Sequence, residues 1–228
     1  TVLLIVANVA VWLYVQGAGY SARIMGEAVC QLGLIPAEVT GLGAGALPDA
    51  SLPCVLGGLT HTAAFSSMFL HGGWLHLLGN MWFLWLFGNN VEDVMGHGRF
   101  IVFYLLVGLA ATVAHVVSAP GSVLPTIGAS GAISGVMGAY LMLYPRVRIQ
   151  TVFVFIIFLR VIPVPAWLVL IMWFALQVLT GYATPADTGG VAVWAHVGGF
   201  VAGVVLVRVF VNSKLMQARR ERALPGTQ

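Results

Sequence analysis

Six stretches of the chain are almost purely apolar, and segments rich in polar residues, glycine or proline separate them. They cover residues 2–15, 74–87, 101–117, 131–143, 165–180 and 191–211. A helix of about 20 mainly apolar residues crosses the hydrocarbon core of a bilayer. The sequence therefore predicts an all-α membrane protein with six transmembrane helices in one domain, residues 1–212. The first segment is short unless further N-terminal residues extend it.

The fifth crossing needs an additional argument, because the apolar run over residues 152–179 is too long for one ordinary span. Arg160, Pro163 and Pro165 interrupt it, and proline breaks a helix that continues through it. We place the crossing at residues 165–180. The stretch 151–162 is expected to be interfacial or re-entrant.

Composition agrees with a lipid environment. Hydrophobic residues make up 60% of the 228 residues and charged residues only 7%, whereas soluble domains carry about 25% charged residues. The surface cannot be covered with water-compatible side chains, so the lipid bilayer is the expected surrounding medium. The net charge of +3 is small and does not indicate a nucleic-acid partner.

The basic residues predict the orientation, because cytoplasmic loops carry the excess of lysine and arginine. The predicted inner side holds Arg99, Arg146, Arg148, Lys214, Arg219, Arg220 and Arg222, and the outer loops 16–64, 118–129 and 181–190 hold only Arg23. Both termini are therefore expected in the cytoplasm. The tail at 213–228 is expected to anchor on anionic lipid. The compact chain favours a prokaryotic cytoplasmic membrane.

The first outer loop, residues 16–64, is long but not polar, since it includes Met25, Leu32 and Ile35. Such a loop is expected to associate with the headgroup region of the membrane. It also contains both cysteines, Cys30 and Cys54. A disulfide in an oxidising compartment and two unpaired thiols are both open.

Ser130 and His196 are polar residues within the apolar segments, where each polar group needs a reason. Ser130 lies in Gly128-Ala129-Ser130-Gly131, where an outer loop enters the fourth helix. Glycine permits a sharp turn, and a helix N-terminus offers free N–H groups to an oxyanion. A simple N-cap would explain Ser130 alone, and a packed, hydrogen-bonded histidine would explain His196 alone. Together they form a candidate nucleophile and base.

Small residues repeat at a spacing of four beside both candidates. They include Gly131 and Gly135 in the fourth helix and Ala195, Gly199 and Gly203 in the sixth. This spacing puts small residues on one face, which lets two membrane helices approach closely. Ordinary helix packing also uses such faces, so the pattern supports a contact between the nucleophile and the base without proving it.

His76 and Asn80 are four residues apart and share a face of the second helix. Loss of one oxyanion donor costs roughly 2.7–4 kcal/mol in a soluble enzyme, whereas a polar bond between membrane helices averages about 0.6 kcal/mol. We expect both side chains to form an oxyanion hole with the Ser130 backbone N–H. Asp187 lies in the loop before His196 and is not placed to orient it, so a dyad is predicted.

These residues fall in four strings: His71-Gly72-Gly73-Trp74-Leu75-His76-Leu77-Leu78-Gly79-Asn80; Gly128–Gly131; Ala195-His196 with Gly199 and Gly203; and Gly88, Glu92, Gly96 and Phe100, spaced by fours. In this order they resemble the rhomboid family of intramembrane serine proteases, over nearly the whole chain. The resemblance implies that Ser130 attacks a peptide carbonyl and that His196 takes its proton and later gives it to the leaving amine. It also implies that His71 lies at the mouth of the active site and that Glu92 holds the inner turn.

The resemblance further implies a substrate gate and cap around residues 167–173 and 181–190. Two features depart from the family pattern. Ser134 stands where many members have an aromatic residue stacked on the catalytic histidine, so either another ring positions His196 or this histidine is held less tightly. The Trp-Arg pair of many first loops is absent, and Arg23 is the only basic residue of this loop.

The expected substrates are single-span or multi-span membrane proteins, cut in or near a transmembrane segment that partly unwinds. A catalytically inactive relative that binds or escorts membrane proteins is the alternative, although such relatives typically lack the serine or the histidine. A transporter or channel is a third hypothesis, but the polar groups cluster near one surface. No cluster of histidine, cysteine and carboxylates has metal-ligand spacing, so no metal or other cofactor is expected. His115 is expected to be packed or hydrogen-bonded.

Overall fold

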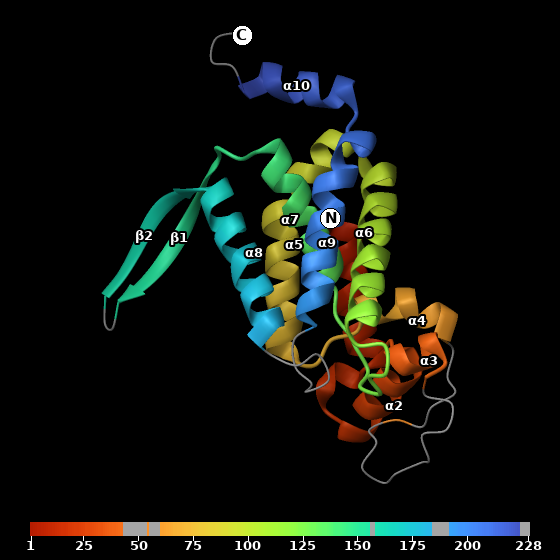
Figure 1. The fold of residues 1–228 in the computed structure, drawn as a ribbon. Coiled ribbons are helices and arrows are strands. Elements are labelled where there is room, and N and C mark those ends of the chain that lie inside the picture. The colour runs from red at the N-terminus through yellow and green to blue at the C-terminus, as the bar shows by residue number, and fades with distance from the viewer. Residues whose placement is uncertain (43–53, 55–59, 156–157, 184–191, 224–228) are drawn as a thin grey trace.

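The fold is a bundle of long helices with short helices gathered at one end (Figure 1). The computed structural model describes residues 1–42, 54, 60–155, 158–183 and 192–223. Within these residues the chain is mostly helical, and its two β-strands form a single hairpin. Helix α10 lies at the end of the bundle opposite to α2 and α3 (Figure 1).

The first apolar segment forms helix α1 (Val2–Ala10), which continues as a π-helical turn, η1 (Val11–Val15). The helical path ends at Gly17, Ala18 and Gly19, whose φ angles are 59°, 52° and 74°. Glycine enters this left-handed region without steric strain, so two glycines around one alanine permit the turn. These three residues form the short 3-10 turn η2 that leads into the outer loop.

The outer loop is largely helical where the structure describes it. Its elements are α2 (Ala22–Leu32), α3 (Pro36–Thr40), α4 (Thr60–Ser66) and the 3-10 turn η3 (Ser67–Phe69). Ser21 caps α2, because its hydroxyl accepts a hydrogen bond from the N–H of Ile24. Cys30 and Cys54 form a disulfide, with their Cα atoms 5.2 Å apart. The pairing that the sequence left open is therefore present.

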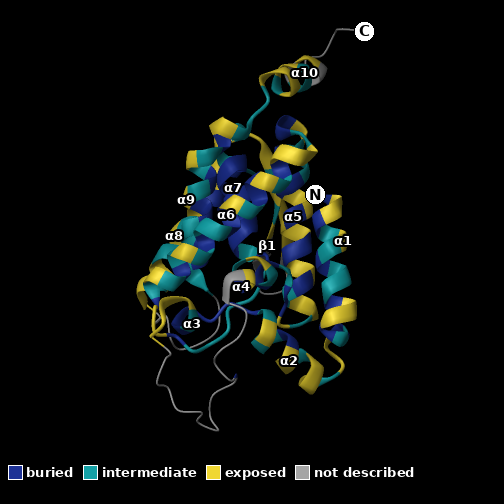
Figure 2. Ribbon diagram, turned by 90° about the vertical axis from the view of Figure 1, so that its right-hand side faces the viewer, coloured by how far each residue is buried: buried dark blue, intermediate teal, exposed yellow. Residues whose placement is uncertain are grey.

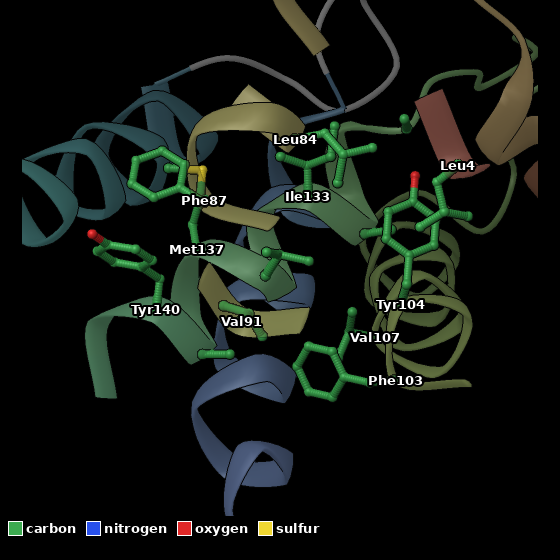
Figure 3. Packing of buried hydrophobic residues seen from close by; sticks show 14 of the residues in the cluster. Leu4, Leu84, Phe87, Val91, Phe103, Tyr104, Val107, Ile133, Met137 and Tyr140 are labelled. Atoms are coloured by element: carbon green, nitrogen blue, oxygen red, sulfur yellow. The ribbon is translucent and has the colours of Figure 1, made fainter. Parts of the chain in front are cut away.

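The centre of the bundle contains α5 (Trp74–Met95), α6 (His97–Ser118), α7 (Ser130–Leu143) and α9 (Val193–Phe210). Helix α7 is the innermost, since every residue from Gly131 to Tyr140 is buried. A helix that is apolar on all sides is expected in such a position. Figure 2 shows the contrast with the more exposed α8 (Ala166–Ala183). In Figure 3, side chains of α5, α6 and α7 pack between the helices, with Phe87 edge-on to Tyr140.

Helices α7 and α9 approach closely along their glycines, as the spacing predicts. A β-carbon on Gly199 would lie less than 3.0 Å from the backbone oxygen of Gly131, and one on Gly203 equally close to that of Gly135. Real β-carbons do not tolerate such distances, so these positions accept only glycine at this helix separation. The contact brings the N-terminal ends of both helices together.

The stretch 151–162 lies in a β-hairpin, and Figure 1 shows the hairpin projecting beside α8. Strand β1 (Arg148–Phe155) pairs antiparallel with β2 (Phe158–Pro165). The interfacial or re-entrant segment expected here thus has regular strand structure. The run is rich in valine, isoleucine and phenylalanine, which favour strands, and its prolines exclude a helix. Helix α8 begins directly after Pro165, close to the expected crossing at 165–180.

The basic tail forms helix α10 (Ser213–Ala223) as far as it is described. Arg219 fixes it to the end of α5, donating to the Oδ1 atom of Asn90 and to Asp93 Oδ2 at 2.8 Å. Its guanidinium also lies 4.9 Å from the ring centroid of Tyr144. The side chains of Arg220 and Arg222 lie outside the described residues.

Three of the described helices are long and apolar enough to cross a membrane, namely α6, α8 and α9. The segments Val2–Val15 and Ser130–Leu143 are apolar but shorter. Each of the six predicted segments overlaps a described helix, and the structure agrees with an all-α membrane protein to this extent.

Candidate active site

The site is built around Ser130, the first residue of α7. Gly128 precedes it with a φ angle of 127°, a conformation that favours glycine. The N–H of Gly128 donates to the carbonyl of Ser67 at 2.8 Å, which fixes the turn against η3. Ser130 therefore enters the helix from a tightly held loop, and its backbone N–H is one of the free donors of a helix start.

His196 lies in the first turn of α9 and contacts Ser130 directly. Its Nε2 atom is 2.8 Å from Ser130 Oγ, although the two residues are 66 positions apart. The close approach of α7 and α9 along their glycines makes this distance possible. The side chain of His196 is buried. The structure thus brings together the predicted nucleophile and the predicted base.

The second nitrogen of His196 contacts a residue that the sequence reasoning missed. Nδ1 lies 2.8 Å from Oε1 of Gln177 on α8. The ring of Trp173, one turn earlier on α8, lies 5.9 Å from the His196 ring. Ser134 instead donates its hydroxyl to the carbonyl of Ser130 at 2.7 Å. Trp173 on α8 thus supplies a ring beside His196, which Ser134 cannot supply.

A signal for Gln177 was present in the sequence. It is the only glutamine within an otherwise apolar helix, Ala166–Ala183, and a polar group at membrane depth calls for a partner. Nothing in the spacing connects it with His196, because sequence spacing does not encode how α8 and α9 face each other. Asp187, which the sequence does not place to orient His196, lies outside the described residues.

His76 faces the same space as Ser130. The N–H of Gly72 donates to Nδ1 of His76 at 3.1 Å, so the neutral ring carries its proton on Nε2. A β-carbon on Gly128 would lie 2.9 Å from this Nε2 and 3.6 Å from Ser130 Oγ. The Nε2–H donor and the hydroxyl therefore flank one small space beside Gly128.

Asn80 is buried one turn further along α5, and its Nδ2 donates to the carbonyl of His76 at 2.9 Å. An amide nitrogen has two hydrogens, so one remains for a second acceptor. Of the predicted oxyanion donors, His76 is thus aimed at the space beside Ser130. Asn80 borders the same cavity with one hydrogen already engaged.

His71 lies behind His76 and not at the mouth of the site, where the resemblance placed it. Its side chain is fully buried, and its ring stands edge-on to that of His76, with centroids 5.1 Å apart. Burial, and secondly the neighbouring His76, lowers the pKa of the His71 imidazole to about 4. His71 is therefore neutral near pH 7.

A cavity of about 750 Å³ opens beside Ser130 and His196. Ser130, His196, His76 and Asn80 all border it, with apolar walls from α5, α7 and α8. Its walls include Phe83, Ile133, Met137, Trp173, Gly181 and Trp194. A mainly apolar cavity with a few convergent polar groups is typical of a ligand or substrate site. The implied cap, residues 181–190, falls largely outside the described residues.

His115 and Glu92, which the sequence also singled out, have structural partners. His115 Nε2 lies 2.7 Å from the hydroxyl of Thr126, so it is hydrogen-bonded as expected. Glu92 contacts His97 across the turn between α5 and α6, at 2.6 Å. Gly96 makes this turn with a φ angle of 81°. Among the described residues no group of three or more histidines, cysteines or carboxylates could hold a metal ion.

The sequence matches the family model of the Rhomboid domain over residues 60–213, which contain the whole site. The chain belongs to the rhomboid family. It is 44% identical over 72 residues to the rhomboid protease GluP of Bacillus subtilis, which covers 32% of this chain and 14% of that protein. The rhomboid resemblance of the sequence is therefore confirmed.

Two eukaryotic relatives match longer parts of the chain. RHOMBOID-like protein 5 of Arabidopsis thaliana is 30% identical over 62% of this chain and 41% of its own length. The mitochondrial Rhomboid protein 1 of Saccharomyces cerevisiae is 28% identical over 69% of this chain and 44% of its own length. The chain thus spans less than half the length of these relatives. Rhomboid proteins are integral membrane proteins and generally intramembrane serine proteases.

Proposed function

We propose that this rhomboid protein is an intramembrane serine endopeptidase that uses Ser130 and His196 as a catalytic dyad. The observation that carries the proposal is the 2.8 Å contact between Ser130 Oγ and His196 Nε2 at the floor of the cavity. A nucleophile within hydrogen-bonding distance of an oriented base is the arrangement that activates a serine hydroxyl.

The reaction follows from these positions. Ser130 Oγ attacks the carbonyl carbon of a peptide bond while its proton moves to His196 Nε2. The C–N bond then breaks as His196 gives this proton to the leaving amine, and an acyl-enzyme remains on Ser130. His196 next takes a proton from a water molecule that attacks the ester carbonyl. Ser130 leaves with that proton, and the new carboxyl terminus is released.

The negative charge of the tetrahedral intermediate needs donors on the far side of the carbonyl. The backbone N–H of Ser130 and the Nε2–H of His76 flank the space beside Gly128. The free hydrogen of Asn80 Nδ2 is the third donor in this proposal. Fixed donors in a water-poor site require no reorganisation as the charge develops, which is why they accelerate the reaction.

The proposed substrates are membrane proteins with one or more spans. Their transmembrane helix has to unwind locally before a carbonyl reaches Ser130, because helix hydrogen bonds otherwise shield the peptide bond. Substrates with helix-destabilising residues near the outer membrane surface and small residues at the cut are therefore expected.

The proposed topology has six spans, both termini in the cytoplasm and the active site toward the outer side of a prokaryotic cytoplasmic membrane. The arginines and lysines near the inner ends of the spans support it. The Cys30–Cys54 disulfide supports it as well, because disulfides form in oxidising compartments outside the cytoplasm.

Replacement of the nucleophile tests this proposal. Ser130→Ala removes the attacking oxygen, and we expect it to abolish cleavage of a reconstituted single-span substrate and labelling by a serine-directed phosphonate. Ser118→Ala removes a hydroxyl at the C-terminal end of α6. It serves as the matched control and should keep both activities. Cleavage or labelling that persists in Ser130→Ala would refute the assignment. Wild-type protein that retains membrane-protein clients without cutting any would favour the escort alternative.

A further inference from the structure

Gln177 gives the dyad a polar contact from α8. Its Oε1 atom lies 2.8 Å from Nδ1 of His196, on the opposite side of the ring from Ser130. A neutral imidazole has one N–H and one lone pair. An amide oxygen can only accept, so the proton of His196 lies on Nδ1. The lone pair on Nε2 then faces the Ser130 hydroxyl, and this is the tautomer that a general base needs.

We propose that Gln177 is a positioning residue, which holds His196 in the tautomer and orientation of the base. Proton transfer at the dyad then requires α8 to lie against α9 at the level of Gln177. The proposal rests on the proposed function, since it concerns the same reaction.

An amide suits this position better than a carboxylate does. A carboxylate would be a second ionisable group in the apolar interior, where an unpaired charge is strongly unfavourable. The amide oxygen carries no net charge, yet it still accepts the Nδ1–H bond when His196 becomes an imidazolium during the reaction. Gln177 can thus hold the ring in both protonation states without a charge of its own.

The other contacts of α8 in this region cannot select a tautomer. The Trp173 ring lies 5.9 Å from the His196 ring, and Phe174 stacks on Phe200 with centroids 4.7 Å apart. Such ring contacts limit where His196 can move but do not distinguish Nδ1–H from Nε2–H. Only 11% of the 18-residue apolar stretch of α8 is buried, against 39% in α6 and 33% in α9. Helix α8 is therefore less tightly packed than α6 and α9. Of these contacts, only the hydrogen bond between Gln177 and His196 can distinguish the two tautomers.

The simpler interpretation is that Gln177 only joins two helices. Hydrogen bonds between membrane helices contribute about 0.6 kcal/mol on average, so that interpretation predicts a small loss of stability and no change in the chemistry of His196. For a variant that lacks the Gln177 amide, the two interpretations thus predict different values of kcat and different tautomers of His196.

The kinetic test compares Gln177→Leu with Gln150→Leu in the full chain reconstituted in liposomes. Gln150 lies exposed in β1 and provides the same substitution away from the site. We expect Gln177→Leu to lower kcat roughly 10- to 100-fold, by analogy with the loss of the outer hydrogen-bond partner of a metal-ligating histidine. KM should stay unchanged, because Gln177 does not border the cavity. Gln177→Glu keeps an acceptor oxygen but brings in the carboxyl group that the apolar interior disfavours, so we expect it to recover kcat only in part.

The spectroscopic test measures the tautomer directly. In protein with ¹⁵N-labelled histidine, the His196 signals are assigned by their loss in His196→Ala. We expect a protonated Nδ1 and an unprotonated Nε2 in the wild type, and a shift toward protonated Nε2 in Gln177→Leu. An unchanged tautomer, or a kcat that falls only as far as the folded fraction falls, would overturn the proposal. Because this measurement needs no turnover, a wild type that proves inactive would refute the proposed function and still leave the tautomer tested.

Discussion

At the scale of single residues, Gln16 connects the first helical segment to the loop that precedes α5. Its amide is fully buried and binds the backbone of His71 twice. Nε2 donates to the His71 carbonyl at 2.7 Å, and the His71 N–H donates to Oε1 at 2.8 Å. The next residue, Gly72, donates its N–H to Nδ1 of His76. Gln16 thus fixes the backbone that sets which nitrogen of His76 can donate to an oxyanion.

Gln16→Leu should therefore destabilise the protein. It leaves a buried N–H and a buried C=O without partners, and each unsatisfied group costs about 1–3 kcal/mol. Because two groups lose their partners, we expect a loss of about 2–6 kcal/mol in the free energy of unfolding, measured by reversible unfolding in mixed micelles. Gln31→Leu, the same change at an exposed site on α2, should stay within about 0.5 kcal/mol of the wild type. Equal effects of the two substitutions would contradict this account of Gln16.

The proximity of Ser130, His196 and His76 could be predicted from the sequence because polar residues stand out in apolar segments. Gln177 carries the same signal, but its partner depends on how α8 faces α9, and no sequence spacing encodes that. The expectation that His71 lies at the mouth of the site was wrong for a related reason. Whether the ring of a loop histidine faces the cavity or the protein interior is set by the Gln16 contact, which lies 55 positions away.

At the scale of elements, the contact between α7 and α9 determines the geometry of the dyad. The missing side chains of Gly199 and Gly203 let the backbones meet. The first glycine lies one turn after His196 and the second lies two turns after it, so any separation of the helices there also moves the base away from Ser130.

Gly203→Ala should consequently impair both stability and activity. The new methyl group would meet the backbone of Gly135, which cannot move aside as a flexible side chain can. Overpacking of this kind typically costs about 1–3 kcal/mol, and a shift of about 1 Å in a reacting group lowers the rate about 100-fold. We expect both losses in thermal unfolding and in kcat.

Gly98→Ala is the matched control for this substitution. Gly98 lies in the first turn of α6, and a β-carbon there would meet no atom within 4 Å. The variant should unfold at or slightly above the wild-type temperature, because alanine favours a helix over glycine by about 1 kcal/mol. A Gly203→Ala protein that matches Gly98→Ala in stability and rate would show that the helices can separate without consequence.

The helices could be located from the sequence more reliably than the hairpin. Long apolar runs identify buried or membrane helices by length alone, whereas a short apolar run fits a strand or a helix equally well. The prolines at 163 and 165 placed the start of the fifth crossing at residue 165, and α8 begins at Ala166. They did not indicate that β1 and β2 pair, because strand pairing depends on a partner segment and not on local pattern.

At the scale of the whole molecule, two independent features mark opposite ends of the bundle. The Cys30–Cys54 disulfide attaches to α2 at one end, and the basic helix α10 lies at the other (Figure 1). Disulfides form where the compartment is oxidising, and basic residues remain in the cytoplasm. Both features support the proposed topology, in which the mouth of the site, near the start of α7, faces the outer side of the membrane.

Single introduced cysteines can test this orientation without further changes to the protein. The chain has two cysteines and both are in the disulfide, so an added cysteine is the only free thiol. Gly121→Cys and Val147→Cys place it at exposed sites before and after α7. In sealed vesicles with the proposed outer side facing outward, a membrane-impermeant maleimide should label Gly121→Cys at once. It should label Val147→Cys only after the vesicles are opened. The reverse pattern would mean that the orientation in the membrane is inverted and that substrates reach Ser130 from the cytoplasmic side. Labelling of both thiols from outside would mean that α7 does not separate two compartments, and the six-span topology would fail even if the dyad is correct.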